Sequence, residues 1–264
     1  MKAILVILVA AAALIGLFFV GRLRQSPEEL PPETEAATLA TEATQPVTEE
    51  ITEEVTEETE PDLTGIPESL LELMEKNPET VDFVLNYPHR QEQIVDISGL
   101  DRSEVPLFLQ WDQRWGYTIY GTDVLALTGC GPTCMAMVGY YLTGKDTFTP
   151  DQMAEFSLEH DYYAWGNGTK WTFFSEGVKK LGLKSKELAL AESVMVDQLD
   201  RGHPIVLNVR KGDFTEHGHY IVVVGYEDGM FRVNDPNSVI RSEKLWSYET
   251  LEPQIRNLWA IWKA

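Results

Sequence analysis

The only two cysteines of the chain lie four residues apart, in the segment LTGCGPTC at residues 127–134. On one helix their Cβ atoms would stand about 5–6 Å apart, whereas a disulfide requires roughly 3.5–4.5 Å. Two cysteines and five scattered histidines also match no zinc-binding pattern. We therefore expect no disulfide, no metal and no cofactor. Each cysteine is then either a small buried side chain or a nucleophile.

Cys130 has the surroundings of a nucleophile. Gly129 and Gly131 flank it and Pro132 follows, a pattern that predicts a tight turn into a helix. The N-terminus of a helix favours a thiolate, and its free N–H groups can hold an oxyanion. The glycines would let a substrate backbone come close. Cys134 falls inside the apolar helix that follows, so we expect it to be a buried filler.

A thiolate needs a base, and His219 is the strongest candidate. It stands at the start of GHYIVVVG (residues 218–225), which predicts a buried strand with an imidazole fixed at its mouth. His217 is the second candidate, in a more polar stretch. Either Asp235 or Asn234, at the end of the following strand, can orient the ring if a hairpin brings them beside His219.

The elements expected to position these residues change character along the chain. Helices come first and β-branched runs later, which predicts an α+β domain whose strands are antiparallel. The capping box Thr149-Pro-Asp-Gln152 opens one of the helices. We expect helices at about residues 67–76, 78–86, 133–142, 149–159, 171–181 and 192–201, and strands at 205–209, 219–225, 230–234 and 258–262.

Taken together, four motifs resemble family thirty-nine of the cysteine peptidases. That family includes the papain-like domains that trim leader peptides in bacteriocin exporters, and free-standing bacterial relatives. The resemblance spans about residues 105–263. Its motifs, in order, are Val-Pro-x-x-x-Gln (residues 105–110), Gly-Cys-Gly-Pro-Thr (129–133), Gly-His-Tyr (218–220) and Asp-Pro (235–236).

This resemblance implies a papain-like fold, with a buried helix carrying Cys130 packed on an antiparallel sheet carrying His219. It implies that His219 acts as base and then acid and that Asp235 orients it. The side chain of Gln110 would join the Cys130 N–H in an oxyanion hole, although nineteen residues separate Gln110 from Cys130. The expected substrate-binding residues are Gly129, Gly131, Trp111 and Gly218.

Aromatic residues are frequent around these motifs, and two interpretations of them remain open. They either line the cleft or pack the core and support the segment between Gln110 and Cys130. The residues concerned are Trp111, Trp115, Tyr117, Tyr162, Tyr163 and Trp165.

The ends of the chain suggest four parts. Residues 1–24, with an unbroken apolar run at 3–20, are either a membrane anchor or a cleaved signal segment. Residues 25–64 form an acidic linker, expected to be disordered, since 25–63 hold twelve Glu, one Asp and no Lys or Arg. A helical lead-in at 65–104 precedes the catalytic domain at 105–264.

These features predict a cysteine peptidase, displayed outside the cytoplasmic membrane or secreted, that acts on peptides or proteins. The net charge of −21 argues against nucleic acid as a partner. A monomer is expected. Two alternatives remain: a thiol hydrolase of peptidoglycan peptides, or a papain-like binding module without catalysis.

Overall fold

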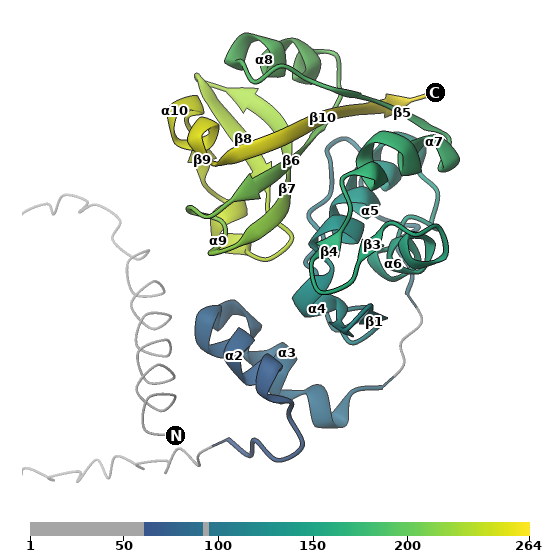
Figure 1. Ribbon diagram of the computed structural model, residues 1–264, viewed down its shortest axis with the longest axis vertical. Coiled ribbons are helices and arrows are strands. Elements are labelled where there is room, and N and C mark those ends of the chain that lie inside the picture. Colours follow the sequence, from purple (N-terminus) through teal and green to yellow (C-terminus); the bar gives the residue numbers. More distant parts are fainter. Residues whose placement is uncertain (1–60, 92–94) are drawn as a thin grey trace, which may run out of the picture. The chain divides into compact units, whose positions relative to one another are not determined.

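A six-stranded antiparallel sheet organises the protein. The computed structural model describes residues 61–91 and 95–264, and Leu63–Ala264 form one compact unit. The strand order is β5-β10-β6-β7-β8-β9 (Figure 1). The strands are β5 (Leu183–Glu187), β6 (Ile205–Arg210), β7 (Gly218–Glu227), β8 (Met230–Asn234), β9 (Leu245–Trp246) and β10 (Ile255–Lys263).

Helices cover both faces of this sheet. Figure 1 shows α5 (Cys130–Thr143) and α8 (Glu192–Asp200) on opposite sides of it. Side chains alternate along a strand, and β6 shows the result: Val206 packs with α5, whereas Ile205 and Leu207 pack with Met195 of α8. The sheet is therefore buried on both faces.

Shorter elements complete the fold. A helical lead-in comprises α2 (Glu68–Lys76), η1 (Pro78–Thr80), α3 (Val81–Leu85) and η2 (Tyr87–His89). It packs on the segment before α5, where the ring of Phe83 stacks on Tyr117 at 4.3 Å. The remaining elements are β1 (Ile119–Tyr120), β2 (Asp123–Val124), α4 (Leu125–Thr128), α6 (Pro150–Glu159), β3 (Tyr163–Ala164), β4 (Gly168–Thr169), η3 (Phe173–Gly177), α7 (Val178–Lys180), α9 (Val239–Ser242), α10 (Tyr248–Leu251) and η4 (Glu252–Gln254).

Most predicted elements are confirmed. The short elements β1–β4, α4, α9 and α10 were not predicted, and four further differences have a physical reason. The capping box at Thr149 is wrong, since the helix starts at Pro150 but the Thr149 hydroxyl is buried and makes no cap hydrogen bond. The helix expected at 171–181 is a π-helical turn followed by the short α7. Strand β5 escaped prediction because its sequence, LKSKE, buries one side chain only, as is usual for an edge strand. The two-residue β9 carries too little pattern to be recognised.

The predicted anchor at residues 3–20 lies outside the described residues, as does the acidic segment up to residue 60. Among residues 61–91 and 95–264, none of the helices has the length and hydrophobicity of a membrane span. The four-part division of the chain remains a prediction.

Candidate active site

Cys130 is the first residue of α5, where the short helix α4 gives way to the long buried one. Its side chain is half-buried and lines a cleft of about 960 Å³. The N–H groups of Cys130 and Gly131 begin the helix and have no intrahelical partner. Pro132 has no N–H, and that of Thr133 donates to the carbonyl of Gly129 at 3.0 Å. Cys134, one turn later, is fully buried, and burial raises the pKa of its thiol. Both thiols are free.

His219 faces the cysteine from the start of β7. Its Nε2 lies 2.7 Å from Oδ1 of Asp235, which leaves Nδ1 for the thiol. Burial alone would lower the pKa of His219, but the Asp235 carboxylate and a hydrogen bond with Cys130 outweigh it and raise that pKa to about 10. The ring therefore favours the imidazolium form.

Strand geometry decides between the two candidate orienting residues. Asn234 pairs with Val222 across β8 and β7, so Asp235, the next residue, points to the opposite face, which it shares with His219. The amide of Asn234 instead donates to the carbonyl oxygens of Val105 and Pro106, at 3.0 and 3.2 Å. Only the Asp235 carboxylate reaches the imidazole.

Asp235 is fully buried, and its carboxylate has three partners among the described residues. Oδ1 accepts from the N–H of Asn237 at 2.8 Å as well as binding His219, and Oδ2 accepts from Nε of Arg241. Burial alone would raise the pKa of Asp235, but His219 and Arg241 reverse this and hold it below its usual range. The sequence reasoning missed Arg241; its place six residues after Asp235, in the same turn-rich segment, was the available signal.

Gln110 lies next to the Asp235 loop but is turned inward. Its backbone N–H donates to the carbonyl of Pro236 at 2.7 Å, and its side-chain Nε2 donates to the carbonyl of Ala126 at 2.5 Å. Its Oε1 is buried and has no partner among the described residues. Gln110 does not line the cleft. An amide nitrogen carries two hydrogens, and Ala126 occupies one of them.

The residues predicted to bind substrate fall into two groups. Gly218 lines the cleft, whereas Trp111 donates from Nε1 to the carbonyl of Asn237 at 3.3 Å and lies outside the cleft lining. The space beside Gly129 and Gly131 is already filled by protein. An added Cβ would stand 2.4 Å from the Leu125 side chain or 2.3 Å from Oγ1 of Thr169. These two glycines are required by packing, and the expectation that they admit a substrate backbone stays a prediction.

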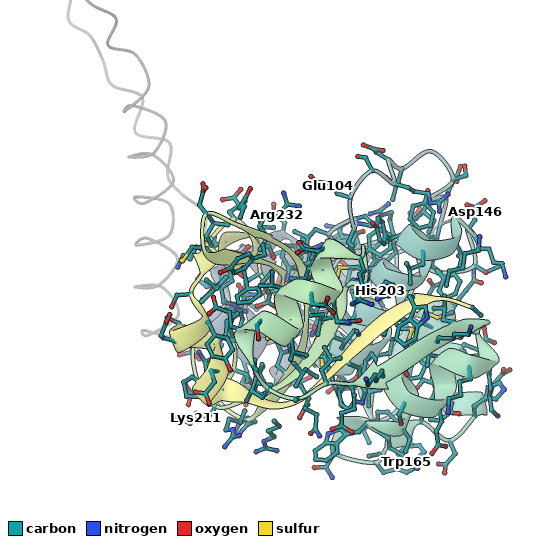
Figure 2. The ribbon with its side chains drawn as sticks, turned by 90° about the horizontal axis from the view of Figure 1, so that it is seen from above. Glu104, Asp146, Trp165, His203, Lys211 and Arg232 are labelled. Atoms are coloured by element: carbon teal, nitrogen blue, oxygen red, sulfur yellow. The ribbon has the colours of Figure 1, made fainter. Side chains whose placement is uncertain are left out.

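The aromatic residues mostly support the core. Trp115, Tyr162 and Tyr163 are buried, and Tyr117 stacks on the lead-in. Of the six that were considered, only Tyr163 lines the cleft. Trp165 is 73% exposed and projects at the edge of the molecule (Figure 2).

The rest of the cleft is formed by the β3–β4 hairpin and the ends of β6, β7 and β10. Thr169 of the hairpin is tied to the site because its carbonyl accepts from the Tyr220 hydroxyl at 3.0 Å. His217, the second candidate base, is exposed and lines the cleft, but no hydrogen bond joins it to the Cys130–His219 pair. Asn208 and Arg256 line it as well.

A cysteine at the start of a buried helix, facing a histidine on an antiparallel sheet, places the fold in the papain-like class. The chain belongs to the Peptidase_C39 like family, whose model matches residues 102–264. This match confirms the family resemblance and the fold class predicted from the motifs.

Two solved structures illustrate the likeness. The peptidase domain of Streptococcus ComA, a bifunctional ABC transporter involved in a quorum-sensing pathway, is 24% identical with a TM-score of 0.40, over 55% of this chain and 96% of that one. A putative C39-like peptidase from Bacillus anthracis is 18% identical with a TM-score of 0.41, over 66% of this chain and 99% of that one. No curated protein matches the chain.

The raised pKa of His219 predicts a specific dependence of stability on pH. A basic group whose folded-state pKa exceeds its unfolded value of 6.5 stabilises the fold fully below pH 6.5, and this contribution is lost as pH rises through about 10. We expect the free energy of unfolding to fall by a few kcal/mol across this window, measured by urea denaturation at a series of pH values.

His219→Gln serves as the control for this measurement, because other groups such as the Cys134 thiol also titrate in the alkaline range. The difference between wild type and His219→Gln should shrink as the pH rises. A difference that is constant from pH 6.5 to 10 would contradict the assigned ion pair.

Proposed function

We propose that this protein is a cysteine peptidase that hydrolyses peptide bonds with Cys130, His219 and Asp235. The observation that carries the proposal is the buried bond, 2.7 Å long, between His219 Nε2 and Asp235 Oδ1, with Cys130 on the other side of the ring. If His219 served only to fill the core, its ring would need no hydrogen bond to a buried carboxylate. The membership of the Peptidase_C39 like family supports a peptidase in general.

The proposed mechanism is acyl transfer in two steps. The Cys130 sulfur attacks the amide carbonyl and forms a C–S bond, while its proton resides on His219. His219 then passes this proton to the leaving amine as the C–N bond breaks. A water molecule, deprotonated by His219, cleaves the thioester, so that a carboxylic acid leaves and the thiol is restored. Asp235 keeps the imidazole oriented and stabilises its cation throughout.

Two groups are proposed for the oxyanion hole. The Cys130 N–H lies at the start of α5 and is aligned with the helix dipole. The family resemblance implies the other donor, the second hydrogen of Gln110 Nε2, whose first is bound by the Ala126 carbonyl. Because Gln110 is buried beside the cleft and not in its lining, this role requires the substrate carbonyl to displace part of the wall. The bond to Ala126 fixes the amide plane, which is what a preorganised donor requires.

The assignment of the nucleophile is tested by alkylation of the full chain with iodoacetamide at neutral pH. Cys130→Ala should abolish labelling of the folded protein. Cys134→Ala, the matched control, should label as wild type does, because the Cys134 side chain is fully buried and its pKa is raised. Incubation with a peptide library, read by mass spectrometry, should show cleavage that Cys130→Ala lacks.

Labelling of Cys134 in place of Cys130 would overturn the assignment. Cleavage of purified peptidoglycan peptides but of no other peptide would identify the substrate as cell wall, which is the alternative hydrolase. Labelling of Cys130 without hydrolysis of either substrate would favour the binding module.

The proposed location is the outer side of the cytoplasmic membrane, with residues 1–24 as anchor and the acidic residues 25–64 as spacer. Support comes from the sequence alone, since 18 apolar residues approach the thickness of a bilayer. We expect an externally added glutamate-specific protease, which can cut after the twelve glutamates of residues 25–63, to remove the folded part from intact spheroplasts while a cytoplasmic marker protein survives. Full protection of the chain would contradict this location.

A further inference from the structure

The cleft differs in charge from the rest of the folded part. Residues 61–264 contain 30 acidic and 18 basic residues, yet no Asp or Glu is among the described residues that line the cleft. Its lining includes Lys170, Arg256 and His217 beside the catalytic histidine. The Nζ of Lys170 is shared with Asp161 at 2.8 Å. The Arg256 guanidinium makes no hydrogen bond or ion pair with any described residue.

A β-bulge places Arg256 in the cleft. Along β10, Ile255 pairs with Val209 and Asn257 pairs with Asn208, so Arg256 is an extra residue opposite a single step of β6. Bulges of this kind redirect a side chain and often occur beside active sites. The unpaired guanidinium is therefore positioned by the backbone of the sheet and not by a partner side chain.

Asn208 adds a second, independent group at the same place. It lies on β6 directly opposite Asn257 and lines the cleft. Only 7% of its surface is exposed. Its Nδ2 makes only a long contact of 3.5 Å with the carbonyl of His219, and its Oδ1 is buried with no partner among the described residues. An unsatisfied buried acceptor costs stability unless a ligand supplies a donor, and a peptide N–H is such a donor.

We propose that Arg256 and Asn208 form a subsite for an acidic side chain of the substrate peptide, Arg256 binding the carboxylate and Asn208 a backbone N–H. This proposal rests on the proposed peptidase function. In the sheet, β10 is separated from β7 by β6, so two strand spacings of about 4.8 Å lie between Arg256 and the His219 strand (Figure 1). At about 3.3 Å per residue, the acidic residue stands about two or three positions from the scissile bond.

Two measurements on the full chain test the subsite. In the first, synthetic hexapeptides of glutamate, glutamine or lysine compete with iodoacetamide for Cys130. In the second, three peptides are compared as substrates that differ only by Glu, Gln or Lys at the position two or three residues from the scissile bond. The glutamate peptides should protect Cys130 and be cleaved at least about tenfold better, which corresponds to 1.4 kcal/mol. The preference should weaken with added salt.

Variants separate the subsite from general charge effects. Arg256→Gln should remove the preference, and Arg256→Glu should reverse it in favour of lysine. Arg201→Gln, the control, removes an exposed arginine on the edge of α8 and should leave the preference intact. If all three hexapeptides protect Cys130 equally, and iodoacetamide labels Cys130 in their absence, the subsite is wrong but the proposed function is not affected. An unreactive Cys130 overturns the proposed function as well.

A different set of contacts joins the helical lead-in to the candidate triad. The Glu79 carboxylate binds the start of α9, where Oε2 accepts from the N–H groups of Val239 and Ile240 at 2.7 and 3.3 Å and Oε1 from the Ser238 hydroxyl. Nearby, Asn77 Nδ2 donates to the carbonyl of Asn237 at 2.7 Å. These two lead-in side chains therefore hold the loop that follows Asp235.

Helix α9 also carries Arg241, the cation that pairs with the buried carboxylate of Asp235. Arg241, on α9, binds Asp235, and Asp235 binds His219. A carboxylate at a helix N-terminus is stabilising, so Glu79 fixes the helix that presents Arg241. Residues 77 and 79 lie outside the range that the family model matches, residues 102–264.

We infer that Glu79 is a positioning residue for the Arg241–Asp235–His219 chain and that the lead-in is a working part of the active site. This inference is separable from the proposed reaction, since it concerns how tightly His219 holds its proton. In Glu79→Ala the displaced Arg241 and Asp235 support the imidazolium less well. His219 should then bind its proton about tenfold more weakly.

An NMR titration of the imidazole nitrogens in the full chain measures this directly. Glu75→Ala, which removes an exposed glutamate of the same lead-in, is the matched control and should titrate as wild type. Glu79→Gln keeps an acceptor for the Val239 N–H and should fall between the two. With the best peptide substrate, Glu79→Ala should lower kcat with little change in KM. Here kcat is calculated per Cys130 thiol that iodoacetamide labels.

The outcome that overturns the inference is a Glu79→Ala protein whose His219 titrates as in Glu75→Ala. The inference is also overturned if Glu79→Ala only lowers the yield of folded protein. In that case the NMR titration of His219 and kcat per reactive Cys130 would both be unchanged. That result would make Glu79 a residue of stability alone.

Discussion

The buried carboxylate of Asp235 is the constraint on which the site depends. A carboxylate without solvent is tolerated only when cations and donors surround it. Here His219, Arg241 and the N–H of Asn237 supply them. Removing any one partner would leave charge buried without compensation, so the loop after β8, the start of β7 and the short helix α9 must all be in place together.

This requirement explains why the segment at residues 105–110 is bonded to the end of β8 and to the loop that follows it. Gln110 reaches the Asp235 loop through the Pro236 carbonyl, and Asn234 holds the strand before it by two bonds to Val105 and Pro106. The cysteine helix packs on the sheet that carries the histidine, through residues such as Tyr220 and Val222. The polar loop and the apolar core thus fix the same relative position of thiol and imidazole.

Sequence reasoning singled out the candidate reactive groups but not the residues that hold them in place. Cys130, His219 and Asp235 stand in short, distinctive contexts of glycine, proline and β-branched residues, and strand alternation excludes Asn234 once the register is known. Glu79, by contrast, is one of many glutamates, and its partner lies 160 residues away in the chain. The bulge at Arg256 depends on pairing between strands, which no local pattern reports. Gly129 and Gly131 also have a packing role that no local pattern indicates, since only the fold shows Leu125 and Thr169 beside them.

The position of β10 has a consequence for how the protein is made. This strand lies between β5 and β6, although it comes from residues 255–263, far later in the chain than either neighbour (Figure 1). A nascent chain that has not reached Ile255 leaves both neighbours with unpaired edges, which are prone to aggregate. Sheet closure is therefore a late, non-local event during synthesis. The cleft, which Arg256 of β10 helps to line, is therefore complete only once residues 255–263 have been synthesised.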